Sequence, residues 1–507
     1  MLKKFTKLLK KKKKNILAIN KYYPASRKLF ILIFFASVLT VAELCRAQEQ
    51  DPVTKLIQNS PAADALWAVQ VRDSSGNILV NYHGERIVRP ASNLKLLMAA
   101  VYLDELGSGF TYKTNLYGFG NQQDDVWKGD LIVEGKGDPS VNGDFYNDDP
   151  LFLFGKWFRI LKEMGIKRVD GNIIGNTSYF DDVPYPEGWE WNDLSFYYGV
   201  EISALSFNSN VVDLEVLADG EIGSIPEIQW FPFNTGYVDF INEQVITSPN
   251  SKYDESYRRI SGTNTILLRS KLPAGYYESE PLSVANPALY FVDTFSKYLE
   301  MGGIRVEGQL LTDGQPVDVN SGSYRILDRH ESPPMSELVK WMNKESDNFF
   351  AEMILKTVAA EKYGIPGSTE MGLEIVKQFM TKAGLNPRYA KFKDASGMAA
   401  STLMKASSLN KLLVYMQNHP EWESYFNSMS KGGIDGTLKN RFGGTPMIGK
   451  FYGKSGFVSG VRTLSGYLDT ENGSRLAVTI ATNNYITGTS VIDVIHEEIL
   501  EYLYRTY

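Results

Sequence analysis

The sequence predicts an α+β protein in which an antiparallel sheet with helices carries a large, mostly β insertion. Three observations lead to this fold class. Strand-like hairpins lie near both ends of the chain, an amphipathic helix closes it, and the middle is rich in glycine, asparagine, aspartate and aromatic residues.

The first hairpin is predicted from residues 66–72 (LWAVQVR) and 78–82 (ILVNY), which alternate like strands around the turn-forming segment 73–77 (DSSGN). Directly after Pro90 and Ala91, a helical run is expected from Asn93 to Leu106.

The far end of the chain repeats this pattern. Residues 463–468 and 476–482 form a second predicted hairpin, and residues 491–504 a helix with apolar side chains at 491, 495, 499 and 503. We therefore expect strands from both termini to share one antiparallel sheet, with the closing helix packed on it.

Between these ends, residues 113–324 are expected to form an inserted, mostly β region, with two nested subdomains. Residues 48–112 and 325–507 would then build the sheet-and-helix domain around it. Within the second part, helical periodicity is present over 336–363 and 371–383.

Residues 1–47 have the pattern of a secretory signal: a lysine-rich start, the apolar stretch 29–42, and small residues before a cleavage site after Ala47. The apolar stretch is shorter than the roughly 20 residues of a membrane-spanning helix. The sequence thus predicts an exported, periplasmic protein. A retained membrane anchor is the alternative, and lipidation of Cys45 is a second one, which the bulky Leu44 disfavours.

Without residues 1–47 the chain has 41 basic and 58 acidic residues, a net charge of −17, which argues against a nucleic-acid partner. Cys45 is the single cysteine, so cleavage after Ala47 leaves no disulfide, cysteine nucleophile or thiolate metal site. The four histidines are far apart in the sequence, which supplies a histidine triad or metal site poorly: His83, His330, His419 and His496. No metal or cofactor is expected.

The first chemical motif is Ser92-Asn93-Leu94-Lys95. Residues three apart share a helix face, so the lysine amine would lie near the serine hydroxyl, and a lysine of lowered pKa can act as a base. The same S-x-x-K spacing recurs at Ser408–Lys411 and Ser428–Lys431. Taken alone, Ser92 is better explained as a helix cap with a solvated lysine one turn later.

Two further motifs are Ser346-Asp347-Asn348 and Lys454-Ser455-Gly456. Separately, the first could be a helix cap and the second an ordinary junction between loop and strand. Together and in this order, the three motifs are the signature of penicillin-binding proteins and class A β-lactamases. The serines at 408 and 428 follow the S-D-N motif and therefore cannot take the first place.

On these motifs the chain resembles the low-molecular-mass class C penicillin-binding proteins, the serine D-alanyl-D-alanine carboxypeptidases and endopeptidases. Further matching segments are LIVEGKGDPSV (131–141), PEGWEWNDLSFYYGVEISALSFNSN (186–210), SPPMSELVKWMNKESDNFFAEMILK (332–356), DASG (394–397) and GGIDGTLKNRF (432–442). The resemblance implies a penicillin-binding, β-lactamase-like transpeptidase fold. Residues 48–112 and 325–507 would be its catalytic domain, and 113–324 two nested domains that class A β-lactamases lack.

The resemblance also implies a reaction. Ser92 would attack the carbonyl of a D-Ala-D-Ala bond in a peptidoglycan stem peptide, while Lys95 takes its proton. Ser346 and Lys454 would pass a proton to the departing nitrogen. Water would then hydrolyse the acyl-enzyme, and β-lactam antibiotics would stall there as covalent inhibitors.

Substrate binding is implied for the same motifs. Asn348 would hold the substrate amide, Ser455 its carboxylate, and the N–H groups of Ser92 and Phe457 the oxyanion. Gly456 would let the substrate backbone approach the strand.

Two residues of the middle segment, Asp193 and Tyr198, match positions that bind the free end of the stem-peptide side chain in relatives. An acid in an aromatic cleft would pair with an ammonium group such as that of diaminopimelate. The alternative is a solvated aspartate and a packing tyrosine.

Two departures from the family pattern affect the interpretation. Ser455 replaces the usual threonine and keeps its hydroxyl, whereas Phe457 replaces a small hydroxylated residue that helps to bind the terminal carboxylate. The choice between carboxypeptidase and endopeptidase action therefore stays open. The rival hypotheses are a β-lactamase, for which no extra acid with a recognisable signature is present, and a catalytically weak peptidoglycan-binding scaffold.

Overall fold

The computed structural model describes residues 51–317 and 324–507. The chain divides into two units, residues 1–60 and 61–507. The described part of the first unit contains helix α3 (Pro52–Gln58), and the predicted signal, residues 1–47, lies outside the described residues. Among the described residues, no helix combines the length and the apolar character that crossing a membrane requires.

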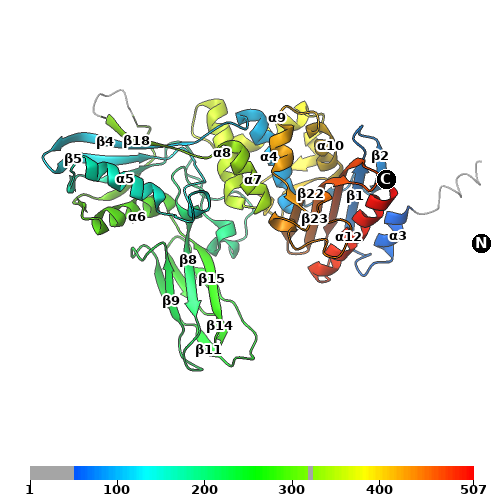
Figure 1. The fold of residues 1–507 in the computed structure, drawn as a ribbon, viewed down its shortest axis with the longest axis horizontal. Coiled ribbons are helices and arrows are strands. Elements are labelled where there is room, and N and C mark those ends of the chain that lie inside the picture. The colour runs from blue at the N-terminus through cyan, green and yellow to red at the C-terminus, as the bar shows by residue number, and fades with distance from the viewer. Residues whose placement is uncertain (1–50, 318–323) are drawn as a thin grey trace, which may run out of the picture. The chain divides into compact units, whose positions relative to one another are not determined.

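The main sheet of the second unit joins strands from the two ends of the chain. Its order is β2-β1-β24-β23-β22-β21, and all neighbours are antiparallel (Figure 1). The strands are β1 (Leu66–Arg72), β2 (Ile78–Tyr82), β21 (Ser430–Lys431), β22 (Phe451–Val458), β23 (Val461–Asp469) and β24 (Arg475–Asn483). Both predicted hairpins and the shared sheet are confirmed.

Helices cover this sheet on both faces. The evidence is that β1 is buried at five consecutive positions, 67–71, whose side chains point alternately to the two faces. Trp67 packs edge-on against His496 of α12 (Thr489–Thr506), whereas the next residue, Ala68, clusters with Ala406 of α10 (Ala406–Met416). Successive side chains of a strand point to opposite faces, so α12 and α10 lie on opposite sides of the sheet.

The helical layer around α10 has α4 (Leu94–Leu106) at its centre, where ten consecutive residues, 94–103, are buried. A helix that is apolar all round is enclosed by its neighbours. Those neighbours include α7 (Met335–Lys344), α8 (Asn348–Tyr363), α9 (Thr369–Lys382) and α11 (Trp422–Asn427).

The helical periodicity predicted over 336–363 is divided between α7 and α8. Ser346 has a φ of +62°, a left-handed conformation that cannot continue an α-helix. Asp347 then begins α8, because its carboxylate accepts a hydrogen bond of 3.0 Å from the Phe350 N–H and caps the new helix.

The segment between α4 and α7 forms sheets of its own. A seven-stranded sheet contains β4 (Lys113–Gln123), β5 (Val126–Glu134), β6 (Arg168–Asp170), β7 (Ile173–Asn176), β16 (Arg305–Val306), β17 (Leu310–Asp313) and β18 (Tyr324–Glu331). Two helices that the sequence analysis did not predict, α5 (Phe152–Glu163) and α6 (Pro287–Met301), contact each other and supply aromatic core residues such as Phe154 and Phe291.

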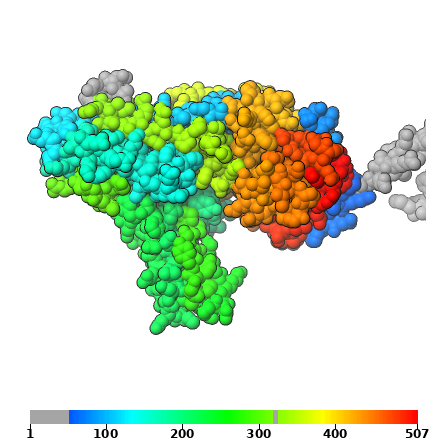
Figure 2. Space-filling model, in the orientation of Figure 1, coloured from blue at the N-terminus to red at the C-terminus, as the bar shows by residue number. Residues whose placement is uncertain are grey.

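The remaining strands of this segment form two three-stranded sheets and one two-stranded sheet, gathered in one green lobe in Figure 2. They are β8 (Val211–Leu217), β9 (Glu227–Phe231) and β15 (Tyr277–Ser283); β10 (Asp239–Asn242), β12 (Tyr257–Arg259) and β13 (Thr265–Leu268); and β11 (Val245–Thr247) with β14 (Lys271–Pro273). Near the first motif, β3 (Ile87–Val88), β19 (Ala390–Lys391) and β20 (Leu403–Lys405) complete the fold.

Candidate active site

Ser92 lies in a short 3-10 turn, η1 (Ala91–Asn93), that leads directly into α4. One turn later, the ammonium nitrogen of Lys95 is within hydrogen-bond distance of the Ser92 hydroxyl, at 3.1 Å. Lys95 also donates to Asn348 Oδ1 at 2.7 Å and to the Ser396 carbonyl at 2.9 Å. Asn348 and Ser396 therefore hold the lysine amine next to the Ser92 hydroxyl.

Burial decides the protonation state of this lysine. The Lys95 side chain is fully buried, and the loss of solvation lowers its pKa to about 8, although the carboxylates of Asp347, Asp394 and Glu352 oppose the shift. About a tenth of a group with this pKa is neutral at pH 7. Lys95 can therefore accept a proton under physiological conditions.

The second motif brings Ser346 to the same place. Ser346 lines the cavity that contains Ser92, and its left-handed backbone turns the chain between α7 and α8. Within the described residues, the Ser346 hydroxyl makes no hydrogen bond. Because it also lines the cavity, it is available to a bound substrate.

The third motif lies on β22, next to η1. Lys454 is fully buried, and burial first, then the charges of Lys95 and Arg462, hold its pKa well below the usual value. Its ammonium nitrogen donates to the Ser455 carbonyl at 2.8 Å, and the Ser455 hydroxyl donates to Thr437 Oγ1 at 2.9 Å.

Gly456 is required by close packing within the protein. A Cβ at this position would lie 2.3 Å from Thr463 Oγ1 and 3.0 Å from the Ser92 nitrogen. Real Cβ atoms do not approach other atoms so closely, so glycine lets the turn that carries Ser92 lie against the strand. From the sequence, this glycine was predicted to let the substrate backbone approach the strand, and its contact with the Ser92 turn was not predicted.

A single cavity of about 1510 Å³ connects these motifs with the inserted segment. Seven of the sequence-predicted site residues line it: Ser92, Asp193, Tyr198, Ser346, Asn348, Ser455 and Phe457. Lys95, Lys454 and Gly456 are buried behind its wall. The two lysines thus act on the cavity from beneath and do not face it directly.

Asp193 and Tyr198 belong to two short turns, η3 (Asp193–Ser195) and η4 (Tyr197–Gly199). Burial, and then the charge of Glu190, raise the pKa of Asp193, whose carboxylate has no hydrogen bond to any described residue. Burial raises the pKa of Tyr198 to about 12. The backbone carbonyl of Tyr198 accepts a hydrogen bond of 3.0 Å from Asn348 Nδ2, which ties the inserted segment to the S-D-N motif.

The other serines with S-x-x-K spacing lie elsewhere. Ser408 is buried within α10, and Ser428 is fully buried, where it accepts from Asn343 at 2.8 Å and donates to the Tyr425 carbonyl. Neither lines the cavity. Among the described residues, no group of three or more histidine, cysteine or acidic side chains is arranged to hold a metal ion.

The chain matches a known protein family over nearly all of its described residues. The model of the D-Ala-D-Ala carboxypeptidase 3 (S13) family matches residues 49–505. The chain belongs to this family. The predictions of a D-Ala-D-Ala peptidase family and of a serine-type enzyme are thereby confirmed.

Individual relatives in this family are distant but nearly full-length. D-alanyl-D-alanine carboxypeptidase DacB of Haemophilus influenzae is 27% identical over 451 residues, covering 86% of this chain and 89% of the relative. The D-alanyl-D-alanine carboxypeptidase of an Actinomadura species is also 27% identical over 451 residues, with coverage of 86% and 81%.

Solved structures confirm the predicted fold class. Penicillin binding protein 4 from Haemophilus influenzae superposes with a TM-score of 0.79 at 24% identity, covering 90% of this chain and all of the other. A second crystal structure of that protein, in complex with a β-lactam, gives a TM-score of 0.74 at 22% identity with the same coverage.

The acid behind Lys95 in this S13-family chain was not predicted from the sequence. Glu352 is fully buried on α8, and its carboxylate accepts hydrogen bonds from the N–H groups of Ala395 and Ser396 at 2.9 Å each. These bonds hold the loop whose Ser396 carbonyl binds Lys95. The available signal was a lone charge inside the apolar run FFAEMIL.

Proposed function

We propose that this S13-family protein is exported and cleaves the bond after a D-alanine in peptidoglycan stem peptides, through an acyl-enzyme on Ser92. The observation that carries the proposal is the 3.1 Å contact between Ser92 Oγ and the amine of Lys95, whose pKa is about 8. A serine with an adjacent amine that can be neutral near pH 7 is an activated nucleophile.

Acylation then follows from the positions of these groups. Lys95 accepts the Ser92 proton as the hydroxyl oxygen bonds to the substrate carbonyl carbon, and the N–H groups of Ser92 and Phe457 stabilise the oxyanion. Asn348 and the Ser396 carbonyl fix the lysine amine, so that it is aimed before substrate arrives.

The departing nitrogen needs a proton when the bond to the carbonyl carbon breaks. Ser346, whose hydroxyl is free at the cavity wall, and Lys454, beneath the same wall, pass this proton on. The proton delivered to the nitrogen is the one that Lys95 took from Ser92, so Lys95 returns to the neutral amine as the bond breaks. Water subsequently hydrolyses the ester, which releases the shortened peptide.

Substrate is bound by the three motifs on one side of the cavity and by the inserted segment on the other. Asn348 holds the peptide amide, Ser455 the carboxylate, and Asp193 with Tyr198 the cationic end of the stem-peptide side chain. The unpaired carboxylate of Asp193 supports this assignment, because a partly buried acid without a partner binds a cation well.

The domain organisation and location belong to the same proposal. Residues 48–112 and 325–507 form the catalytic domain, residues 113–324 the insertion, and residues 1–47 direct export to the periplasm. The location of the substrate in the cell wall and the lysine-rich, apolar start of the sequence support export.

Purified muropeptides test the reaction directly. Loss of a terminal D-alanine, seen by mass spectrometry, identifies a carboxypeptidase, and splitting of cross-linked dimers identifies an endopeptidase. If neither product forms and nitrocefin is turned over rapidly, the protein is a β-lactamase. If no substrate is turned over, it is a binding scaffold.

A further inference from the structure

One arginine of the cavity wall is not explained by the three motifs. Arg462 lies on β23, directly opposite Phe457 in the β22–β23 pairing, and lines the same cavity as Ser92, Ser455 and Thr437. Phe457 is 55% exposed there and has no polar side-chain atom to offer a substrate.

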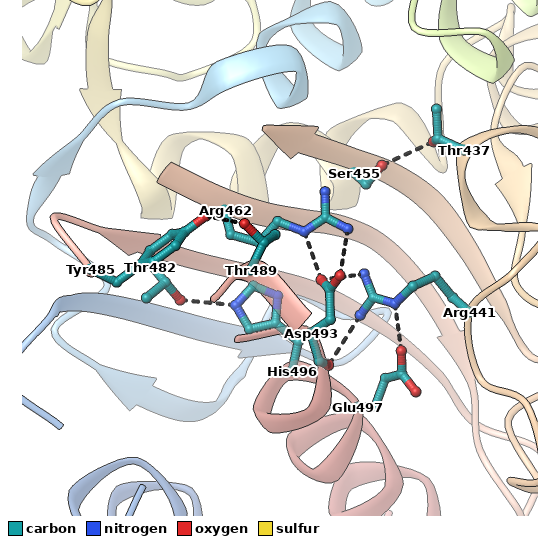
Figure 3. Close-up of polar contacts among 10 residues, drawn as sticks. All are labelled: Thr437, Arg441, Ser455, Arg462, Thr482, Tyr485, Thr489, Asp493, His496 and Glu497. Atoms are coloured by element: carbon teal, nitrogen blue, oxygen red, sulfur yellow. Dashed lines mark hydrogen bonds and ion pairs between the residues drawn. The ribbon is translucent and has the colours of Figure 1, made fainter. Parts of the chain in front are cut away.

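One edge of the Arg462 guanidinium is firmly held from behind. Its Nε and Nη2 donate to the two carboxylate oxygens of Asp493 on α12, at 2.6 and 3.0 Å (Figure 3). Asp493 is itself fixed by Arg441, whose Nη1 donates to it at 2.7 Å, and Arg441 bonds in turn to Glu497 at 2.5 Å.

The other edge of the guanidinium has no partner. No described residue accepts a hydrogen bond from Arg462 Nη1, and Figure 3 shows this nitrogen pointing away from Asp493, towards the paired hydroxyls of Ser455 and Thr437. The Arg462 side chain is only 13% exposed, so its free donors open into the cavity and not onto an outer surface.

The charges around the cavity favour the binding of an anion at Arg462. Acidic side chains predominate among the charged lining residues, and the lining cations are Arg89 and Arg462. The Arg89 side chain makes no ion pair or hydrogen bond with any described residue, so nothing fixes its direction, whereas Asp493 orients Arg462. A guanidinium held on one edge and free on the other binds a carboxylate with defined geometry.

We propose that Arg462, together with the hydroxyls of Ser455 and Thr437, binds the free carboxylate of the amino acid that leaves during acylation. Arg462 thus takes over the role of the hydroxyl that Phe457 lacks, and Asp493 and Arg441 position it. The inference rests on the proposed function and names its specificity: leaving groups that carry a free carboxylate beside the departing atom.

A matched pair of thioesters tests this. Both carry the same acyl-D-alanyl group, and the leaving group is either mercaptoacetate, with its free carboxylate, or mercaptoacetamide. Wild type should prefer the acid. Arg462→Gln should lower kcat/KM for the acid by about 10- to 150-fold, the range of a lost charge-assisted hydrogen bond, and change the amide little.

Three further variants complete the test. Arg441→Gln removes only the outer part of the ion-pair network and leaves the bonds between Asp493 and Arg462, so the preference for the acid should fall less than in Arg462→Gln. Arg462→Lys keeps the cation but loses the guanidinium fork, and should lose the preference even if Arg462→Gln proves unstable to heating. Arg89→Gln should leave the preference unchanged.

An undiminished preference for the acid in Arg462→Gln and Arg462→Lys overturns the inference, as does a preference that disappears with Arg89 instead. These outcomes leave the proposed function intact if Ser92→Ala still abolishes thioester turnover. Absence of turnover by wild type contradicts both proposals together.

Discussion

The side-chain oxygen of Asn348 lies 2.7 Å from the ammonium nitrogen of Lys95. The amide nitrogen of the same asparagine donates to the Tyr198 carbonyl at 3.0 Å, so one side chain connects the proposed base with the inserted segment. Any change in the charge at this position acts directly on Lys95.

Asn348→Asp places a carboxylate against the lysine, which stabilises the ammonium form and raises the pKa of Lys95. Acylation should therefore slow at pH 7 by tenfold or more, if the pKa rises by about one unit or more, and recover at higher pH. The rate of penicillin acylation measured from pH 6 to 10 checks this. A profile that coincides with wild type would show that Lys95 is not the base.

The wild-type pH profile follows from the pKa of about 8 for Lys95. The neutral amine is the reactive form, so its fraction and the acylation rate should rise as pH increases through about 8 and then level off. Lys95→Arg keeps the cation but offers no base in this range, and acylation should fall by about two orders of magnitude or more. An acylation rate that is flat from pH 6 to 9 contradicts this role.

Asp193→Asn tests the recognition of the stem-peptide side chain. If its unpaired carboxylate binds an ammonium group, kcat/KM for a diaminopimelate-containing peptide should drop by about 10- to 150-fold. A small thioester without that charge serves as the control substrate and should react almost normally. Equal losses on both substrates would indicate general damage to the cavity, and no loss would leave Asp193 without a role.

Gly456→Ala tests the close packing of η1 on β22. The added Cβ would lie 2.3 Å from Thr463 Oγ1 and 3.0 Å from the Ser92 nitrogen, so the Thr463 side chain or the turn that carries Ser92 must shift. We expect the free energy of unfolding to fall by about 1–3 kcal/mol, as for other overpacked sites, and acylation to slow because Ser92 moves. Chemical denaturation and penicillin acylation measure the two effects. Gly443→Ala, where nothing lies within 4 Å of the new Cβ, is the control.

The sequence predicted the features that depend on residues close together in the chain. Ser92 and Lys95 lie one helical turn apart, and their mutual position needs no tertiary information. The hairpins 66–82 and 463–482 were equally accessible because alternation and turn residues are local signals.

Contacts between parts of the chain that are distant in the sequence were not predicted. Nothing in the sequence indicates that Glu352 holds the loop of Ser396, or that Arg462 meets Asp493 of α12. Helices α5 and α6 were missed because their aromatic residues, which fill the core between them, resemble the strand-forming composition of the surrounding segment.

The identity of the nucleophile is the central claim, and covalent labelling tests it most directly. Wild type, Ser92→Ala and Ser408→Ala are incubated with a fluorescent penicillin, digested, and analysed by mass spectrometry. The adduct should map to the peptide that contains Ser92, persist in Ser408→Ala and disappear in Ser92→Ala. An adduct that persists in Ser92→Ala, or that maps to Ser408 or Ser428, would contradict the account.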